Sequence, residues 1–317
     1  MNFVKYYLIL VVKMLNFFWL KKLILKTVAK TRGITFRDKA DYFELKKNNS
    51  LIYVNKNHLV YTRDIINSFD YYFDAVESVQ VDKYSLVDYS KPGYHDVKGY
   101  NRHPVFFPSF SEPLATTHQY IEFANLSKGS VVFDLGAYAG LTSIIFKDIV
   151  GEEGSVIAVD ADTFNIKALE KNFSLYKNIT GLQIEFLEGA VWSHANGVSF
   201  SSEGNMGSSA VSILGLKRGG AVNLVQSFTL SSIVQSLNVR QVDFIKCDIE
   251  GGEAEIFKDA AFFEKFKPRI IIEAHLINNI ETTKQFMDDL EQYGYSFNEI
   301  DQPGVVLPLI ECYPPES

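Results

Sequence analysis

From Gly129 onward, short apolar runs alternate with stretches of helical spacing. The first run, Val131–Leu135, has the continuous apolar character of a strand that is buried on both faces of a sheet. Helical spacing follows at residues 141–149, and residues 155–159 repeat the strand pattern. Strands that alternate with helices form a parallel sheet, because each helix returns the chain to the start of the next strand. The pattern predicts an α/β domain over residues 129–317.

The same alternation continues toward the C-terminus. Further strands are predicted at residues 182–187, 242–247 and 269–273, and further helices at 163–176, 253–263 and 281–293. The last two apolar runs, 295–300 and 305–310, are joined by Asp301-Gln302-Pro303-Gly304, a turn sequence. The domain is therefore expected to be a parallel sheet with a closing antiparallel pair, preceded by an N-terminal extension.

The first predicted strand ends in a glycine-containing turn, DLGAYAG (residues 134–140). Gly136 permits a tight turn and a close approach of another backbone, and Gly140 lets the next helix begin near the strand. The turn lacks the middle glycine of GxGxxG, the fingerprint that aims a helix at a pyrophosphate. Its spacing disfavours an NAD-dependent oxidoreductase and is consistent with a nucleoside cofactor whose tail carries no phosphate.

Two more strand ends complete a predicted cofactor site, because ligands of such sheets bind beyond the carboxyl ends of the strands. Asp160 ends the second strand, where a carboxylate can accept both hydroxyls of a ribose. The third strand ends at Glu188-Gly189-Ala190, beside the expected adenine. Any one of these residues could be structural, since an aspartate at a strand end is often a helix cap. The predicted cofactor-binding residues are Asp134, Gly136, Tyr138, Gly140, Asp160, Glu188 and Ala190.

Together these motifs resemble the FkbM family of S-adenosylmethionine (SAM) dependent methyltransferases. The matching segments are VVFDLGAYAGLTS (131–143), AVDAD (158–162), TLSSIVQ (229–235), VDFIKCDIEGGEAEIFKDA (242–260) and IIIEAH (270–275). The fourth is the most specific, because it resembles the IKxDxEGxE block of that family. Asp160 replaces the usual Glu, and Ser231 stands where Asp is common. The first 37 residues lie outside the resemblance.

The resemblance implies a Rossmann-like class I methyltransferase sheet with SAM as cofactor. Asp134, Gly136 and Gly140 would surround the methionine part of SAM, and Asp160 would hold its ribose. The family mostly methylates hydroxyl groups on sugars, surface glycans or natural products, so the expected acceptor is a small molecule or a glycan. The alternative is a non-catalytic glycan-binding or scaffold protein that retains the fold, against which the intact motif residues count.

Methyl transfer to an alcohol needs an aligned nucleophile and a base or metal that removes its proton. Lys246, Asp248 and Glu250 lie at or just beyond the end of the fourth strand, and Glu273 and His275 at or just beyond the end of the fifth. These side chains should therefore converge at one sheet edge. His275 is the best base by its intrinsic pKa. Asp248, Glu273 and His275 could instead ligate Mg or Mn, or Lys246 and the acids could form a structural ion-pair cluster. We predict metal-free catalysis by His275, Asp248, Lys246 and Glu273.

The charge of the chain is unevenly distributed. The net charge is −7, yet the first 37 residues hold eight Lys or Arg and no acidic residue. The rest is strongly acidic, which argues against a nucleic-acid partner because phosphate binding needs a basic surface. Cys247 and Cys312 form no evident disulfide or metal framework. This scarcity of cysteine fits the cytoplasm, and the basic N-terminus adds the inner face of the membrane as an expected location.

Residues 3–29 are rich in aliphatic and aromatic residues but are interrupted by lysines. Lys13 near the middle disfavours a membrane-spanning helix, and no signal-peptide cleavage site is present. A basic amphipathic helix over residues 1–37 explains the composition, with peripheral contact to a membrane surface and packing on protein, including a homo-oligomer partner, as equal alternatives.

Residues 38–128 are expected to form a cap or substrate region ahead of the methyltransferase domain at 129–317. Within them, the runs 51–54 and 58–61 predict a hairpin that turns at Asn55-Lys56-Asn57. Residues 89–113 are rich in Pro, Gly and aromatics and predict an ordered loop. Residues 116–126 have helical spacing and lead into the core domain.

Overall fold

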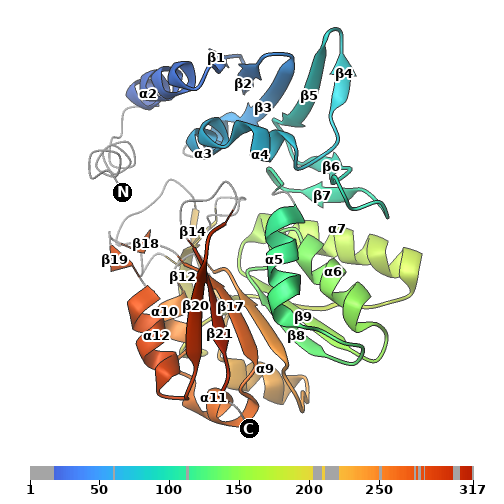
Figure 1. The fold of residues 1–317 in the computed structure, drawn as a ribbon, viewed down its shortest axis with the longest axis vertical. Coiled ribbons are helices and arrows are strands. Elements are labelled where there is room, and N and C mark those ends of the chain that lie inside the picture. Colours follow the sequence, from blue (N-terminus) through green and yellow to red (C-terminus); the bar gives the residue numbers. More distant parts are fainter. Residues whose placement is uncertain are drawn as a thin grey trace. The chain divides into compact units, whose positions relative to one another are not determined.

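The structure is a computed structural model that describes residues 18–59, 61–111, 114–202, 209–210, 221–249, 252–274, 276–277, 280–281, 283–302 and 308–315. The chain forms two compact units, Met1–Leu114 and Ala115–Ser317 (Figure 1).

The first unit is built on a five-stranded sheet. Its strands lie in the order β1 (Thr35–Asp38), β2 (Tyr42–Lys47), β3 (Ser50–Asn55), β5 (Tyr84–Tyr89) and β4 (Val79–Val81). Only the β3–β5 pair is parallel within this sheet. Two short helices, α3 (Thr62–Asn67) and α4 (Phe69–Phe73), follow β3 in the chain, and β6 (Gly93–His95) pairs with β7 (Val105–Phe107) in the predicted loop region.

The predicted hairpin within residues 51–62 is wrong. Strand β3 forms where its first run was expected, but it pairs with the preceding strand β2 across a turn at Asn48, which adopts a φ of 54°. Asparagine tolerates this left-handed conformation better than most residues. After β3, the side chain of Asn55 accepts a hydrogen bond from the main-chain N–H of Asn57 at 2.9 Å. This local cap starts a 3-10 turn, Lys56–His58, in place of a second strand.

Helix α2 (Phe18–Thr31) is the described part of the predicted N-terminal helix, and residues 3–17 lie outside the described residues. Leu25 and Ala29, one turn apart, are buried, and the helix contacts β1 and α3. Trp19 and Leu23 are 62% and 54% exposed. One face of α2 therefore packs on its own unit. In the described part of the chain, no helix has the length and apolar character needed to cross a membrane.

The second unit contains a seven-stranded sheet. Its order is β10 (Glu185–Glu188), β9 (Ser155–Asp160), β8 (Val131–Leu135), β16 (Phe244–Cys247), β17 (Arg269–Glu273), β21 (Leu309–Tyr313) and β20 (Ser296–Ile300). The five strands from β10 to β17 are parallel, β21 is antiparallel to β17, and β20 is antiparallel to β21. The predicted parallel sheet with a closing antiparallel pair is confirmed. The last strand lies later in the chain than predicted, because Leu309, Ile310 and Cys312 supply its buried positions.

Helices pack on both faces of this sheet (Figure 1). On one face, the Phe146 ring of α6 (Leu141–Val150) lies 5.6 Å from the Phe244 ring of β16, and the Phe123 ring of α5 (Leu114–Ala124) lies 6.3 Å from it. The opposite face packs against α9 (Leu230–Ser236), α11 (Ala260–Phe266) and α12 (Thr283–Glu291). Side chains alternate along a strand, so Lys246 shares the Phe244 side of β16 while Ile245 and Cys247 enter the core cluster of the opposite face.

The helix predicted at residues 253–263 is divided. Helix α10 (Glu253–Ile256) ends early, and α11 begins after Asp259. The carboxylate of Asp259 accepts a hydrogen bond from the Phe262 main-chain N–H at 3.4 Å, so an internal N-cap restarts the helix.

Helix α5 belongs to the second unit, ahead of the predicted domain start at Gly129. The guanidinium of Arg269 on β17 donates a hydrogen bond to the Phe123 carbonyl oxygen at 2.8 Å, and the Tyr120 hydroxyl reaches Glu273 on the same strand. These contacts tie α5 to the sheet. The role of residues 38–128 as a cap over the substrate stays a prediction.

Candidate functional site

The turn after β8 has a backbone that only glycine accommodates at its first position. Gly136 has a φ of 77°, and a Cβ there would lie 1.7 Å from the Asp248 carbonyl oxygen. The Asp248 N–H donates to the Leu135 carbonyl oxygen at 3.0 Å, so the chain leaving β16 lies directly against this turn. The close backbone approach predicted for Gly136 is thus made to the segment that follows β16.

The rest of the turn is held by β9 and α7 (Thr163–Thr180). Gly140, with a φ of 80°, precedes α6, and a Cβ there would lie 2.5 Å from the Phe173 ring of α7. Tyr138 has a φ of 52°, which is uncommon for a bulky residue, and its N–H donates to a carboxylate oxygen of Asp160 at 2.8 Å. The glycine turn and the predicted ribose-binding carboxylate therefore form one connected structure.

Asp160 lies at the carboxyl end of β9 and is nearly buried. Its carboxylate also accepts hydrogen bonds from the Asp162 main-chain N–H at 2.9 Å and from the Asn165 side-chain amide at 3.2 Å. Burial raises the pKa of Asp160 to about 7, although the hydrogen bonds from Asp162, Tyr138 and Asn165 oppose the shift. A carboxyl group with this pKa would gain from a ligand that donates hydrogen bonds to its ionised form.

Asn165 is a candidate site residue that the sequence analysis missed. It lies in the first turn of α7, five residues after Asp160, and is buried. Its side-chain oxygen has no hydrogen-bond partner among the described residues, although its amide group bonds to Asp160. Because a buried acceptor without a partner is costly, it fits a ligand that brings a donor. Its place in the first helical turn after the second strand is the signal that could have found it.

Glu188 and Ala190, the expected adenine neighbours, follow the same sheet edge. Glu188 ends β10 directly opposite Asp160 in the parallel register. The N–H of Gly189 donates to the Asp160 carbonyl oxygen at 2.8 Å, and Ala190 begins β11 (Ala190–Val191), which pairs with β15 (Ser227–Phe228). Glu188 is exposed and Ala190 is half-buried. Their contact with a cofactor stays a prediction.

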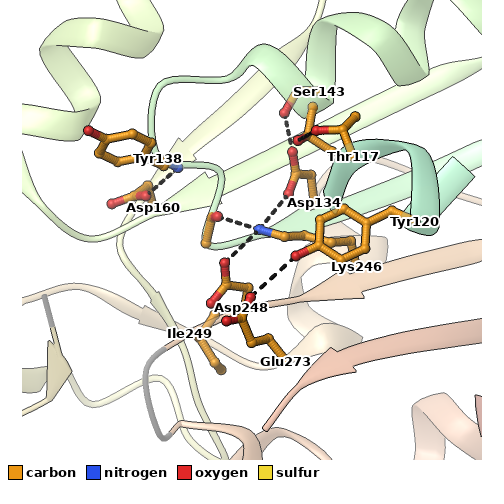
Figure 2. Close-up of polar contacts among 12 residues, drawn as sticks. Thr117, Tyr120, Asp134, Tyr138, Ser143, Asp160, Lys246, Asp248, Ile249 and Glu273 are labelled. Atoms are coloured by element: carbon orange, nitrogen blue, oxygen red, sulfur yellow. Dashed lines mark hydrogen bonds and ion pairs between the residues drawn. The ribbon is translucent and has the colours of Figure 1, made fainter. Parts of the chain in front are cut away.

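Lys246 links the fourth strand to the glycine turn, as Figure 2 shows. Its Nζ donates a hydrogen bond to the Gly136 carbonyl oxygen at 2.6 Å and lies 3.4 Å from Asp134 Oδ1 and 3.5 Å from Asp248 Oδ2. Lys246 and Asp134 are direct neighbours in the β16–β8 register. Asp134 is fully buried and accepts a hydrogen bond from the Ser143 hydroxyl of α6. These contacts hold the turn from beneath, and direct contact of Asp134 with a cofactor stays a prediction.

The same contacts decide the protonation of Lys246. Burial alone would lower its pKa, but the carboxylates of Asp134, Asp248 and Glu273 outweigh burial and raise the pKa of Lys246 above its ordinary value. A lysine that stays protonated cannot take up a proton from the molecule that receives the methyl group. Lys246 is one of the predicted catalytic residues, and its contacts suit a residue that positions its neighbours. It also forms ion pairs with Asp134 and Asp248, as the alternative of an ion-pair cluster expects.

Asp248 and Glu273 come together near this lysine from neighbouring strand ends (Figure 2). The side chain of Asp248 is 26% exposed, which is the greatest exposure in the Asp134–Lys246–Asp248 set. Tyr120 of α5, another residue that the sequence analysis missed, is 3.4 Å from Glu273 Oε2 through its hydroxyl, and Lys246 Nζ lies 5.9 Å from its ring centre. No local sequence signal joins α5 to β17. Glu250 and His275 lie outside the described residues.

Over the part of the chain that the structure describes, no three His, Cys, Asp or Glu side chains are grouped as a metal-ligand set. The proposed ligand His275 is not in that part, so the metal alternative is tested by experiment below. Lys246 already places a positive charge 3.5 Å from Asp248, one of the three residues of the metal alternative.

The chain matches two models of protein families. The model of the methyltransferase FkbM domain matches residues 134–297, slightly more than half of the chain. The chain belongs to the FkbM methyltransferase family. A second model, for protein-L-isoaspartate(D-aspartate) O-methyltransferase, matches residues 46–189. No curated protein matches this chain in sequence.

Three of the solved structures that resemble this chain have low sequence identity to it. A methyltransferase FkbM from Methylobacillus flagellatus KT shares 14% identity with a TM-score of 0.46, covering 91% of this chain and 58% of its own. The precorrin-6y C5,15-methyltransferase from Geobacter metallireducens GS-15 shares 14% identity with a TM-score of 0.40, covering 65% of this chain and 89% of its own. Fibrillarin from Aeropyrum pernix, with S-adenosyl-L-methionine bound, shares 12% identity with a TM-score of 0.40, covering 88% and 98%. This chain thus spans little more than half of the Methylobacillus protein.

The family membership and the sheet show an FkbM methyltransferase domain with a Rossmann-like class I fold. The described residues fit SAM, the cofactor that the family implies. The glycine turn brings two backbones together, and the Asn165 oxygen beside Asp160 lacks a donor among the described residues. A ribose supplies hydroxyl donors of the kind that this carboxylate and this oxygen would accept.

Proposed function

We propose that this FkbM methyltransferase methylates a hydroxyl oxygen on a sugar, a glycan or a natural product. The observation that carries the proposal is the place of Asp248. Asp248 directly follows β16. Its main chain lies against the glycine turn, and its side chain is partly exposed. A carboxylate there can accept a hydrogen bond from a hydroxyl group and aim its oxygen at the methyl donor. SAM, when bound, supplies a methyl group on a positively charged sulfur.

The chain's own residues divide the remaining work in this proposal. Lys246 stays charged and fixes Asp248 relative to the glycine turn. Asp248 and Glu273 orient the acceptor hydroxyl, and the imidazole of His275 accepts its proton, because histidine titrates near neutral pH. Tyr120 holds Glu273 through its hydroxyl.

A small molecule or glycan acceptor also agrees with the charge of the chain. The full chain holds 31 basic and 38 acidic residues, and eight of the basic ones precede Asp38. Residues 38–317 therefore hold 23 basic and 38 acidic side chains. A nucleic-acid acceptor would meet a predominantly acidic protein, which opposes phosphate binding. Neutral hydroxyl-bearing sugars meet no such repulsion.

Transfer of a labelled methyl group tests the proposed reaction. The purified protein is incubated with methyl-labelled SAM and with extracts from a strain that lacks its gene, and the labelled products are identified by mass spectrometry. We expect a methyl ether on a sugar or natural product, and the same compound should lack one CH2 increment in the deletion strain. A product methylated on nitrogen, carbon or a carboxylate would contradict O-methylation of a hydroxyl.

A further inference from the structure

The first unit carries a groove between helix α2 and strand β1, outside the residues proposed above for methyl transfer. Its volume is about 610 Å³. The lining residues are Trp19, Lys22, Leu23, Lys26, Phe36, Arg37, Asp38 and Lys39. They combine apolar and basic side chains, with a single carboxylate among them. Such a lining suits an amphiphile with a negative charge.

Helix α2 presents two different faces. Leu25 and Ala29 are buried within the first unit. Trp19, Leu23 and Lys26 follow one another at helical spacing along the groove, and the first two are the largely exposed apolar residues of this helix. Packing on the domain therefore explains one side of α2 and leaves the exposed apolar and basic side to be explained.

The groove keeps a positive charge after its own ion pairs are formed. Asp38 is held by Lys22 at 2.6 Å and by Lys56 at 2.7 Å, and these hydrogen bonds lower its pKa. Arg37 and Lys39 both pair with Glu44, at 2.8 Å and 3.8 Å. Lys26 is exposed, and no acidic residue occurs in the sequence before Asp38. More cations than carboxylates thus line the groove, and its field favours anions.

We propose that this groove, with the exposed side of α2, docks the protein on a bilayer that contains anionic phospholipid. The lysines and Arg37 meet the phosphates, and Trp19 and Leu23 enter the boundary between headgroups and acyl chains. Tryptophan is suited to this boundary, because its ring is apolar and its N–H is polar. The distribution of charge agrees, since the first 37 residues hold eight basic and no acidic residues whereas the rest of the chain is acidic overall.

The exposed apolar side chains favour a lipid over a soluble anion or a nucleic acid. A phosphate ion would be bound by the cations alone and would leave Trp19 and Leu23 in water. Burial of these side chains contributes only where the partner has an apolar phase. A bilayer supplies the phosphates and that phase at one surface.

Sedimentation with vesicles tests the proposal on the full chain. Vesicles of equal parts phosphatidylcholine and phosphatidylglycerol are compared with vesicles of phosphatidylcholine alone, at low and high salt. The test variant is Leu23→Ser/Lys26→Glu. The matched control is Ile179→Ser/Lys284→Glu in the second unit, because Ile179 is also 54% exposed and Lys284 is also exposed, and both variants make the same change in net charge.

We expect the wild type and the control to bind the anionic vesicles and to be released by salt, and the groove variant to partition on the order of tenfold more weakly. Circular dichroism and SAM affinity should match for all three proteins, which shows that the folds are intact. Wild-type protein that ignores anionic vesicles at low salt, an equal loss in the control, or release by millimolar inorganic phosphate would overturn the proposal. Equal or stronger retention on single-stranded DNA, lost in the same groove variant, would also overturn it in favour of a polyanion site.

Discussion

The His275→Ala variant is expected to turn over about 10²–10⁴-fold more slowly than the wild type, with SAM affinity unchanged. The loss is large because an alcohol is a weak nucleophile until its proton is removed, and histidine is the proposed residue whose ordinary side-chain chemistry best suits a general base. Single-turnover rates with saturating SAM measure the chemical step. His118→Ala is the control, because His118 is exposed on α5 and has no proposed role. A His275→Ala enzyme with wild-type turnover would exclude His275 as the base.

The same assay separates the metal-free mechanism from the metal alternative. We expect EDTA to leave activity unchanged, because Lys246 already pairs with Asp248, one of the carboxylates that would have to hold the ion. If Asp248, Glu273 and His275 instead hold an ion, EDTA abolishes activity and Mg or Mn restores it. Asp248→Asn would then be as damaging as His275→Ala. That result would overturn the mechanism and leave the family and the fold unchanged.

Gly136→Ala is expected to destabilise the protein by about 3–5 kcal/mol and to abolish SAM binding. The added methyl group would lie 1.7 Å from the Asp248 carbonyl oxygen, so the glycine turn and the segment after β16 must separate. That separation would also pull Lys246 away from the Gly136 carbonyl oxygen. Urea unfolding measures the stability, and calorimetry measures the SAM affinity.

Gly181→Ala is a matched control for this prediction. Gly181 has the same φ of 77° at the end of α7, but a Cβ there has no atom within 4 Å. The control contains the cost of left-handed backbone alone, about 1 kcal/mol, and SAM affinity should be kept. If the two alanine variants lose equal stability and both bind SAM, the close approach at Gly136 is not needed for the structure of the glycine turn or for SAM binding.

Much of the sheet could be predicted because its strands are short apolar runs whose burial on both faces leaves a clear pattern. Val131–Leu135 and Arg269–Glu273 were predicted with the bounds that the structure has. The pairing of residues 51–62 could not be predicted, since a short apolar run such as 58–61 does not itself show whether it will form a strand that pairs with the run before it. Asn55 caps a turn with its side chain, and that local hydrogen bond decided the outcome.

The candidate site was predictable only as a set of strand ends. The rule that ligands bind at the carboxyl edge brought Asp160 and Asp248 to attention. The partner of Lys246 could not be read in the same way, because Asp134 becomes its neighbour only through the β8–β16 register. Tyr120 reaches the edge from α5, whose packing on β17 depends on tertiary contacts. Residues contributed by packing therefore escaped the sequence analysis, whereas those contributed by strand ends did not.

SAM is expected to bind at the edge formed by the glycine turn and Asp160, and the dependence of SAM affinity on pH tests this site directly. Burial raises the pKa of Asp160 to about 7, so the carboxylate is ionised above that pH and protonated below it. Ribose hydroxyls donate to the ionised form, and affinity should therefore fall by up to about tenfold per pH unit below the pKa.

Calorimetric titration with SAM across this range should show a plateau in the wild type at alkaline pH and a decline as the pH falls through 7. Asp160→Asn removes the charge that strengthens two hydrogen bonds, so it should bind more weakly by about 1.5–3 kcal/mol for each and lose the pH dependence. Glu185→Gln, at an exposed carboxylate of β10, should behave as wild type. A wild-type protein that shows no binding heat with SAM, or an Asp160→Asn protein with the affinity and pH profile of the wild type, would contradict binding of SAM at Asp160.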